Sequence, residues 1–243
     1  MSNRNWIIRT VLISAVVGMA VYVHGRSDQV VKDRFHRLSY ADKNTFWRNQ
    51  WFGIQTLQNP NDAWIIQEII SEIKPDYIVE AGTFMGGSAL MWASILREVN
   101  PNGRVITIDI EDKSAEAKKR DIAQKMITFK IGSSIDPKIV SEIGRQVQGK
   151  KVVVILDSNH SRDHVLKEMQ SYSPLVNVGS YLIVQDSDIN GHPIYITEGE
   201  GHGPGPMEAI EAFLPSQQNF KVDSDRERLL YTTNPRGYLK RLN

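Results

Sequence analysis

The stretch that decides the fold is Tyr77-Ile78-Val79-Glu80-Ala81-Gly82-Thr83-Phe84-Met85-Gly86-Gly87-Ser88. Its first half is mostly apolar and predicts a buried strand, and its glycines predict a tight turn into a helix. Gly82 lets the chain turn where a side chain would collide, and Gly86 and Gly87 would let a ligand approach the backbone. The acid Glu80 is expected to end the strand, inside the crevice. The stretch therefore predicts a ligand-binding crevice at a strand, turn and helix junction.

The second informative feature is the acid that ends the next apolar run, Arg104-Val105-Ile106-Thr107-Ile108-Asp109. A dinucleotide-binding turn carries the spacing G-x-G-x-x-G, which the glycine turn here lacks. Asp109 is placed to accept hydrogen bonds from ribose hydroxyls. Carboxylates around a glycine turn without a pyrophosphate cradle favour S-adenosylmethionine, which has a ribose and a cationic amino acid tail but no phosphate. The alternative is an ordinary turn of an α/β fold.

Strand and helix patterns alternate along the rest of the chain. Helices are expected at 63–73, 87–99, 115–125, 137–147, 161–171 and 207–213. Strands are expected from 77, 105, 127, 151 and 180, around 220 and at 228–232. Asp62 is the expected N-cap of the first helix. The alternation predicts an α/β fold with a doubly wound, mostly parallel, Rossmann-like sheet, and its last two strands are expected to form an antiparallel C-terminal edge.

Three regions are expected: an N-terminal apolar segment (1–25), a helical or lid region (26–60) and a catalytic domain (61–243). Residues 10–23 are uncharged and mostly apolar, and Arg4 and Arg9 precede them. We favour an uncleaved membrane anchor, with Arg9 reaching the interface and the catalytic domain on the cytoplasmic side. A cleaved signal peptide or an apolar helix packed on a partner are the alternatives.

The composition excludes several classes of function. The 29 Lys and Arg residues nearly balance 28 Asp and Glu, so no general positive field attracts nucleic acid, and no nucleic-acid partner is expected. The chain has no cysteine, which excludes disulfides, thiolate zinc sites and cysteine nucleophiles. Any metal must therefore be bound by oxygen or imidazole.

Acidic residues follow two neighbouring strands of the predicted sheet. Asp157 ends one apolar run, and Asp186 follows the next. Because the carboxyl ends of parallel strands meet at one edge of a sheet, we expect these two acids to lie close together. With the amide oxygen of Gln185 they would form an oxygen-rich site that suits Mg²⁺.

Two histidines follow the first of these acids. His160 is the expected catalytic base, because an imidazole can accept a proton from a substrate hydroxyl near neutral pH. His164 lies one helical turn later and is expected to cap or pack its helix. A zinc site built on both histidines is a weaker interpretation, since the usual Glu of that motif is Ser161 here.

The most specific motifs lie in the C-terminal half: Leu156-Asp157-Ser158-Asn159-His160-Ser161, Val184-Gln185-Asp186, Gly203-Pro204-Gly205-Pro206 and Asn234-Pro235-Arg236-Gly237-Tyr238-Leu239-Lys240-Arg241. Together with the glycine turn and Asp109, they resemble the cephalosporin hydroxylase and rhamnosyl O-methyltransferase family over roughly residues 61–241. The resemblance implies a class I S-adenosylmethionine-dependent methyltransferase with a divalent-metal site.

The resemblance also implies roles for individual residues. Glu80, Gly82 and Ser88 would surround the methionine part of the cofactor, with Gly86 beside them. Asp109 would bind the ribose, and Asp157 with Asp186 would bind the metal. The family often carries an acid where this chain has Gln185, so we expect weaker metal binding.

The expected function is Mg²⁺-dependent methyl transfer from S-adenosylmethionine to a hydroxyl of a small molecule, with a sugar or glycolipid as the acceptor that the family suggests. The lid region and the loop 190–206 are expected to line the acceptor pocket. One alternative is a non-haem iron hydroxylase that uses His160, His164 and the two acids. The other is a membrane-attached cofactor-binding protein without catalysis.

Overall fold

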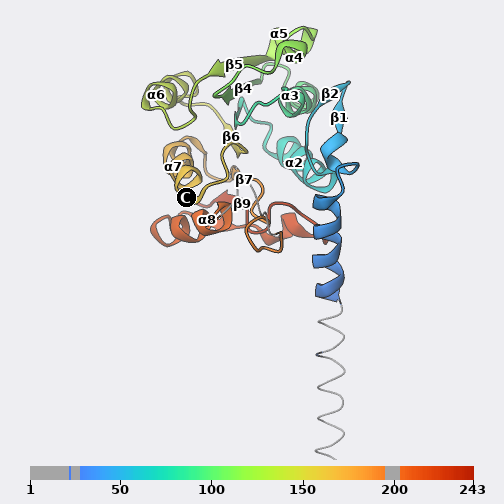
Figure 1. Ribbon diagram of the computed structural model, residues 1–243. Coiled ribbons are helices and arrows are strands. Elements are labelled where there is room, and N and C mark those ends of the chain that lie inside the picture. Colours follow the sequence, from blue (N-terminus) through green and yellow to red (C-terminus); the bar gives the residue numbers. More distant parts are fainter. Residues whose placement is uncertain (1–21, 23–27, 195–202) are drawn as a thin grey trace, which may run out of the picture.

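A twisted sheet forms the centre of the protein (Figure 1). The computed structural model describes residue 22 and residues 28–194 and 203–243. Within them the sheet has seven strands in the order β5-β4-β3-β6-β7-β9-β8. The parallel strands are β3 (Tyr77–Ala81), β4 (Arg104–Asp109), β5 (Ile127–Ile131), β6 (Val152–Leu156) and β7 (Tyr181–Val184). β8 (Phe220–Val222) and β9 (Tyr238–Arg241) complete an antiparallel edge. The predicted fold class is confirmed.

Helices cover both faces of this sheet (Figure 1). One face packs against α2 (Pro60–Ile73), α3 (Gly87–Val99) and α5 (Asp121–Met126), and the other against α6 (Pro137–Gln146), α7 (Arg162–Tyr172) and α8 (Pro206–Phe213). Shorter elements are α4 (Ala115–Lys118), η2 (Ser173–Leu175), η3 (Leu214–Ser216) and η4 (Ser224–Glu227). Because both faces are covered, every residue of β6 is buried, which explains its unbroken apolar sequence.

The sheet winds in two directions from its first parallel strand. β3 pairs with β4 on one side and with β6 on the other. Ligands of such sheets bind outside the carboxyl ends of the strands at this point. Gly82 and Asp157 directly follow these two central strands, so the junction seen in the sequence lies at the switch point.

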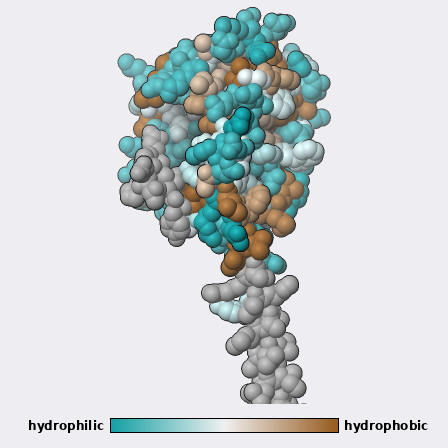
Figure 2. Space-filling model, turned by 45° about the vertical axis from the view of Figure 1, so that its right-hand side comes forward, coloured by the Kyte–Doolittle hydropathy of each residue, from teal (hydrophilic) through white to brown (hydrophobic). Residues whose placement is uncertain are grey.

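The lid region forms a helix over 28–41, then η1 (Phe46–Arg48) and a small hairpin of β1 (Gln50–Trp51) and β2 (Ile54–Gln55). Apolar side chains gather where this helix joins the domain (Figure 2). The exposed apolar residues of the helix are Val30, Val31, Phe35 and Leu38. In the described part of the chain, no helix has the length and apolarity to cross a bilayer. The expected anchor over 10–23 lies outside the described residues, apart from Tyr22.

Two local predictions were wrong. Asp62 is not the N-cap of α2, because Pro60 begins the helix and the side chain of Asn59 accepts from the amide of Asn61 at 3.1 Å. Asp62 is instead buried and accepts from the Thr233 amide at 2.8 Å and the Tyr238 hydroxyl at 2.7 Å. The C-terminal segment thus folds back onto the start of α2.

The predicted strand at 228–232 does not form. Leu230 has a φ of 66° and is 69% exposed, so its backbone leaves the extended conformation that a strand needs. The edge strand is β9 instead, where Tyr238 and Leu239 are fully buried. It lies between β7 and β8 and pairs with both.

Candidate metal and cofactor site

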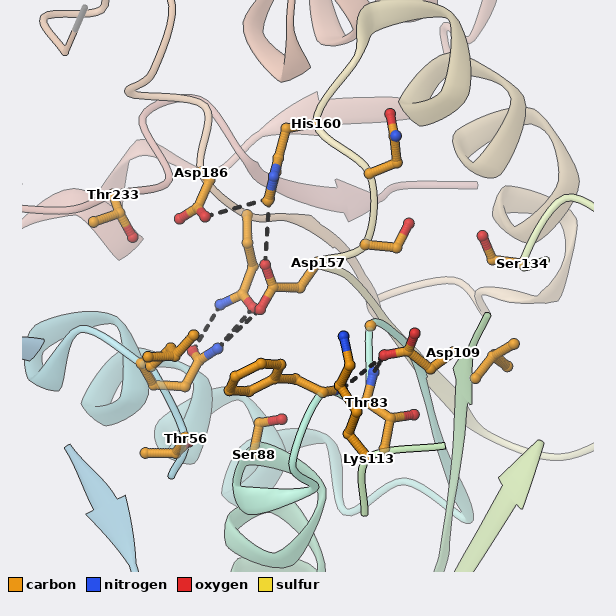
Figure 3. A pocket seen from close by; sticks show the side chains of 18 of the residues that line it. Thr56, Thr83, Ser88, Asp109, Lys113, Ser134, Asp157, His160, Asp186 and Thr233 are labelled. Atoms are coloured by element: carbon orange, nitrogen blue, oxygen red, sulfur yellow. Dashed lines mark hydrogen bonds and ion pairs between the residues drawn. The ribbon is translucent and has the colours of Figure 1, made fainter. Parts of the chain in front are cut away.

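A cavity of about 690 Å³ opens at the carboxyl ends of the parallel strands. Its lining residues come from four strand ends, namely Gly82, Asp109, Asp157 and Asp186, and from the lid region. Figure 3 shows Asp186, His160 and Asp157 on one side of this cavity and Asp109 and Ser134 on the other. The cavity therefore extends across the rim of the sheet.

Asp157, His160 and Asp186 form a compact cluster at this rim. The Nε2 atom of His160 lies 3.6 Å from Asp157 Oδ1 and 3.3 Å from Asp186 Oδ2 (Figure 3). Asp186 has a left-handed φ of 54°, and its amide donates to the side chain of Asn234 at 3.0 Å. The structure thus brings the two predicted metal-binding acids together and places the predicted base between them.

The cluster has unusual electrostatics. Burial raises the pKa of Asp157 to about 6, against the lowering effect of His160. Burial by itself would lower the pKa of His160, but the two carboxylates beside it outweigh burial and raise that pKa well above its ordinary value. Carboxylates this close repel each other unless a positive charge separates them.

The residues of the cluster fit a divalent cation. One ligand atom from each of the three side chains lies within 4.8 Å of the others. The Nε2 atom of His160 is buried and has no hydrogen-bond partner of normal geometry among the described residues. A buried polar atom without a partner beside two carboxylate oxygens is typical of a place prepared for a ligand.

Gln185, the third predicted ligand, is engaged elsewhere. Its amide oxygen accepts from Gln58 Nε2 at 3.0 Å, and its amide nitrogen donates to Gln58 Oε1 at 2.9 Å. Gln58 Nε2 also donates to Asp157 Oδ2 at 3.1 Å. Because a carboxylate oxygen only accepts, Asp157 fixes the orientation of both amides. The cluster is thus completed by His160, while Gln185 supports it through Gln58.

The glycines of the turn make room for the protein chain itself. A Cβ atom on Gly82, where φ is +98°, would lie 1.8 Å from the carbonyl oxygen of Asp157. A Cβ on Gly86 would lie 2.7 Å from Ala117 Cβ, and one on Gly87 would lie 2.2 Å from the carbonyl oxygen of Gln55. Of the three turn glycines, only Gly82 lines the cavity. Protein atoms occupy the space beside Gly86 and Gly87, so the expected approach of a ligand to these two glycines stays a prediction.

The other predicted cofactor residues divide into two groups. Ser88 and Asp109 line the cavity, and Asp109 Oδ2 also accepts from the Phe84 amide at 2.7 Å, which fixes the turn. Glu80 does not line it: its carboxylate is buried and accepts from Trp92 Nε1 at 2.9 Å and Thr107 Oγ1 at 2.6 Å. Burial raises the pKa of Glu80 to about 7. Glu80 thus lies beneath the turn.

Comparison with known proteins shows the family of the chain. Residues 43–242 match the family model described as Rhamnosyl O-methyltransferase/CmcI. The chain belongs to this family. Proteins named rhamnosyl O-methyltransferase from Mycobacterium tuberculosis (strain ATCC 25618 / H37Rv) and Mycobacterium leprae (strain TN) are each 36% identical to it. The matches cover 97% of this chain and 98% of the first relative, and 95% and 97% for the second. The predicted family and enzyme class are confirmed.

Two solved methyltransferase structures share the fold. A structure described as "cmcI-D160 Mg-SAM" has a TM-score of 0.59 at 18% identity, over 80% of this chain and 77% of that one. The O-methyltransferase TomG from Streptomyces achromogenes, in complex with SAM, has a TM-score of 0.53 at 16% identity, over 77% and 82%. These likenesses support the Rossmann-like methyltransferase fold.

The second histidine lies apart from the cluster. His164 Nε2 is 3.1 Å from Ser134 Oγ and 3.3 Å from Glu168 Oε1. Among the described residues, the group that could hold a metal ion contains His160 alone of the histidines. The two-histidine iron site of the hydroxylase alternative is therefore not assembled, and neither is the zinc pair.

Proposed function

We propose that this protein is an S-adenosylmethionine-dependent and Mg²⁺-dependent O-methyltransferase that acts on a hydroxyl group of a sugar. The main support for the proposal is that Asp157, His160 and Asp186 lie together at one side of the cavity. Asp109 lines the same cavity further along the rim. The donor and the metal agree with the Mg and SAM of the CmcI structure.

Asp157 and Asp186 would hold the cation. Mg²⁺ supplies a positive charge that orients an acceptor hydroxyl and makes its proton more acidic. Gln58 keeps the Asp157 carboxylate in place, and Asn234 holds the backbone of Asp186. Precise placement of the reacting groups is the largest contribution expected of such a site, worth roughly 7–11 kcal/mol.

His160 would take the proton that the acceptor hydroxyl loses, at Nε2. The two carboxylates that flank this atom stabilise the imidazolium that results. A positioned base typically contributes about 10²- to 10⁴-fold in rate. The same atom is near enough to act as a metal ligand, and the two roles differ in what removing the ring does to metal affinity.

The methyl donor would lie across the strand ends. Its sulfonium group has to face the cluster at β6 and β7, while Asp109 at the end of β4 would bind its ribose. In the strand order β5-β4-β3-β6-β7, the adenine then lies beyond β4. That end of the cavity is lined by Ile110, Ser133 and Ser134.

Aromatic residues of the lid region support a sugar as the acceptor. Tyr40, Phe46 and Trp47 line the cavity that contains the cluster. Phe46 and Trp47 are stacked with centroids 5.0 Å apart. Flat aromatic faces pack well against the C–H face of a sugar ring, and the mycobacterial relatives are named for a rhamnosyl acceptor.

The test is methyl transfer from labelled S-adenosylmethionine to a panel of rhamnosyl glycosides and matched glycosides of other sugars. Transfer should require Mg²⁺, stop with EDTA and return when Mg²⁺ is added. Asp186→Asn should lose activity, whereas Asp163→Asn, which changes an exposed acid of α7, should keep it. Binding of S-adenosylhomocysteine without transfer to any hydroxyl would contradict the proposed reaction.

The protein would act at a membrane surface on a glycolipid acceptor. The apolar sequence of residues 10–23 and the exposed stripe of Val31, Phe35 and Leu38 on helix 28–41 support this location. The full chain should float with vesicles in a density gradient. Protein that stays unbound with vesicles of every lipid composition tested would contradict the proposed location.

A further inference from the structure

A buried acid lies behind the end of the cavity that would hold the adenine. Glu168 of α7 is 0% exposed and does not line the cavity. Its Oε1 atom accepts from Ser134 Oγ at 2.5 Å and from Ser158 Oγ at 2.6 Å. Ser134 and Ser158 come from different loops, and both line the cavity. One carboxylate oxygen therefore binds the hydroxyl groups of two residues that line the cavity.

These contacts fix the direction of the hydroxyl hydrogens. A serine hydroxyl has one hydrogen and two lone pairs. Ser134 and Ser158 each use that hydrogen on Glu168, so their oxygens can only accept hydrogen bonds from other groups. Glu168 thereby turns two groups of ambiguous polarity into acceptors.

The same reasoning fixes the tautomer of His164. Its Nε2 atom lies 3.1 Å from Ser134 Oγ, 3.3 Å from Ser158 Oγ and 3.3 Å from Glu168 Oε1. None of these three atoms has a hydrogen left to donate, so Nε2 must carry the hydrogen. In the neutral ring Nδ1 is then an acceptor. This group of residues consequently offers acceptors to the cavity.

We propose that Glu168 is a positioning residue that makes this end of the cavity specific for a ligand carrying an amine donor, the exocyclic amine of adenine. The inference rests on the proposed function, because it concerns how that enzyme's methyl donor is recognised. Adenine presents an NH₂ group where hypoxanthine presents a carbonyl. A carbonyl would face serine oxygens that have no hydrogen to give, and such unmatched buried acceptors disfavour binding.

Glu168→Gln tests this polarity. Glu168 Oε2 has no hydrogen-bond partner among the described residues. The new amide nitrogen would therefore turn toward the two serines, which can accept both of its hydrogens, rather than toward the unpartnered side. The serine hydrogens would then be free to face the cavity. The side chain keeps its size, and Asp163→Asn on the same helix is the matched control for loss of one charge.

The measurement is calorimetric binding of S-adenosylhomocysteine and S-inosylhomocysteine to the full chain. The wild type and Asp163→Asn should bind the adenosyl ligand about 10- to 100-fold more tightly, and Glu168→Gln should lose at least about tenfold of that ratio. Should Glu168→Gln not fold, Ser134→Ala is expected to lower the ratio by weakening the adenosyl ligand alone.

Three results would overturn the inference. They are a wild type that binds both ligands equally, a Glu168→Gln variant that keeps the full ratio, and a Ser134→Ala variant that weakens both ligands equally. If the wild type binds neither ligand, S-adenosylmethionine is not the methyl donor. That result would refute the proposed function as well as this inference. A purely structural role for Glu168 would lower both affinities together and leave the ratio unchanged.

Discussion

The backbone of Gly82 passes so close to Asp157 that a methyl group on Gly82 would lie 1.8 Å from the Asp157 carbonyl oxygen. The glycine turn and the acid proposed to bind the metal are therefore one structural unit. We predict that Gly82→Ala costs about 3 kcal/mol or more of folding free energy, from steric overlap and from the positive φ. Urea unfolding measures it.

A matched control separates collision from backbone strain. Gly179 has a φ of +83°, and a Cβ there meets nothing within 4 Å. Gly179→Ala should cost only about 1–2 kcal/mol. Equal losses for the two variants would show that the contact with Asp157 is unimportant.

His160→Ala should slow methyl transfer by about 10²- to 10⁴-fold if His160 is the base. Binding of S-adenosylhomocysteine should be unchanged, and the affinity for Mn²⁺, measured as a paramagnetic probe of the metal site, should change little. His192→Ala, which removes an imidazole paired with Glu208 outside the cluster, is the control. A large loss of metal affinity would make His160 a ligand instead.

Gln58→Ala should weaken metal binding by about tenfold or more, because loss of a group that orients a ligand commonly has that effect. It also leaves the buried amide of Gln185 without its partner, which should lower stability by about 1–3 kcal/mol. Titration with Mn²⁺ and thermal unfolding measure the two effects. Gln67→Ala, which removes a contact to Ser71 within α2, should leave metal affinity unchanged, and equal metal affinity in both variants would refute the role of Gln58.

The raised pKa of Glu80 should make the stability of the protein depend on pH. Burial raises its pKa from 4.5 to about 7, so the folded state binds the proton more tightly than the unfolded state. Its contribution is fully present below about pH 4.5 and is lost as the pH rises through about 7. Above that pH, the free energy of unfolding of the wild type should therefore fall by up to about 3 kcal/mol relative to that of Glu80→Gln.

Urea unfolding at several pH values between 4 and 8 checks the sign. The difference in the free energy of unfolding between wild type and Glu80→Gln should grow with pH. Glu98 is exposed, so the unfolding free energy of Glu98→Gln should follow that of wild type at every pH. Parallel curves for Glu80→Gln would mean that Glu80 keeps an ordinary pKa in the folded protein.

The sequence was sufficient for the parts of the site that local patterns control. Asp157 and Asp186 each follow a short apolar run, and the rule that parallel strands end at one edge of a sheet predicts that they lie close together. Their distances to His160 agree with that expectation. The glycine turn was also predicted, because a collision at Gly82 follows from the shape of any such junction.

Contacts over long sequence separations could not be predicted. Gln58 lies 99 residues before Asp157, and no periodicity links the two. The buried carboxylate of Asp62 depends on Thr233 and Tyr238, which only the folded C-terminal segment delivers. The role of Glu168 depends on Ser134 and Ser158, which lie in other loops, so no local pattern indicates it.

The place of β9 has a consequence for biosynthesis. This strand, residues 238–241, separates β7 from β8, so the middle of the half-sheet that carries Asp186 is synthesised after both of its neighbours. During translation, one edge of β7 stays unpaired until those residues emerge from the ribosome. An unpaired strand edge can pair with other chains. The nascent protein thus keeps this edge open until residues 238–241 have left the ribosome, and fusion tags belong beyond that point with a spacer.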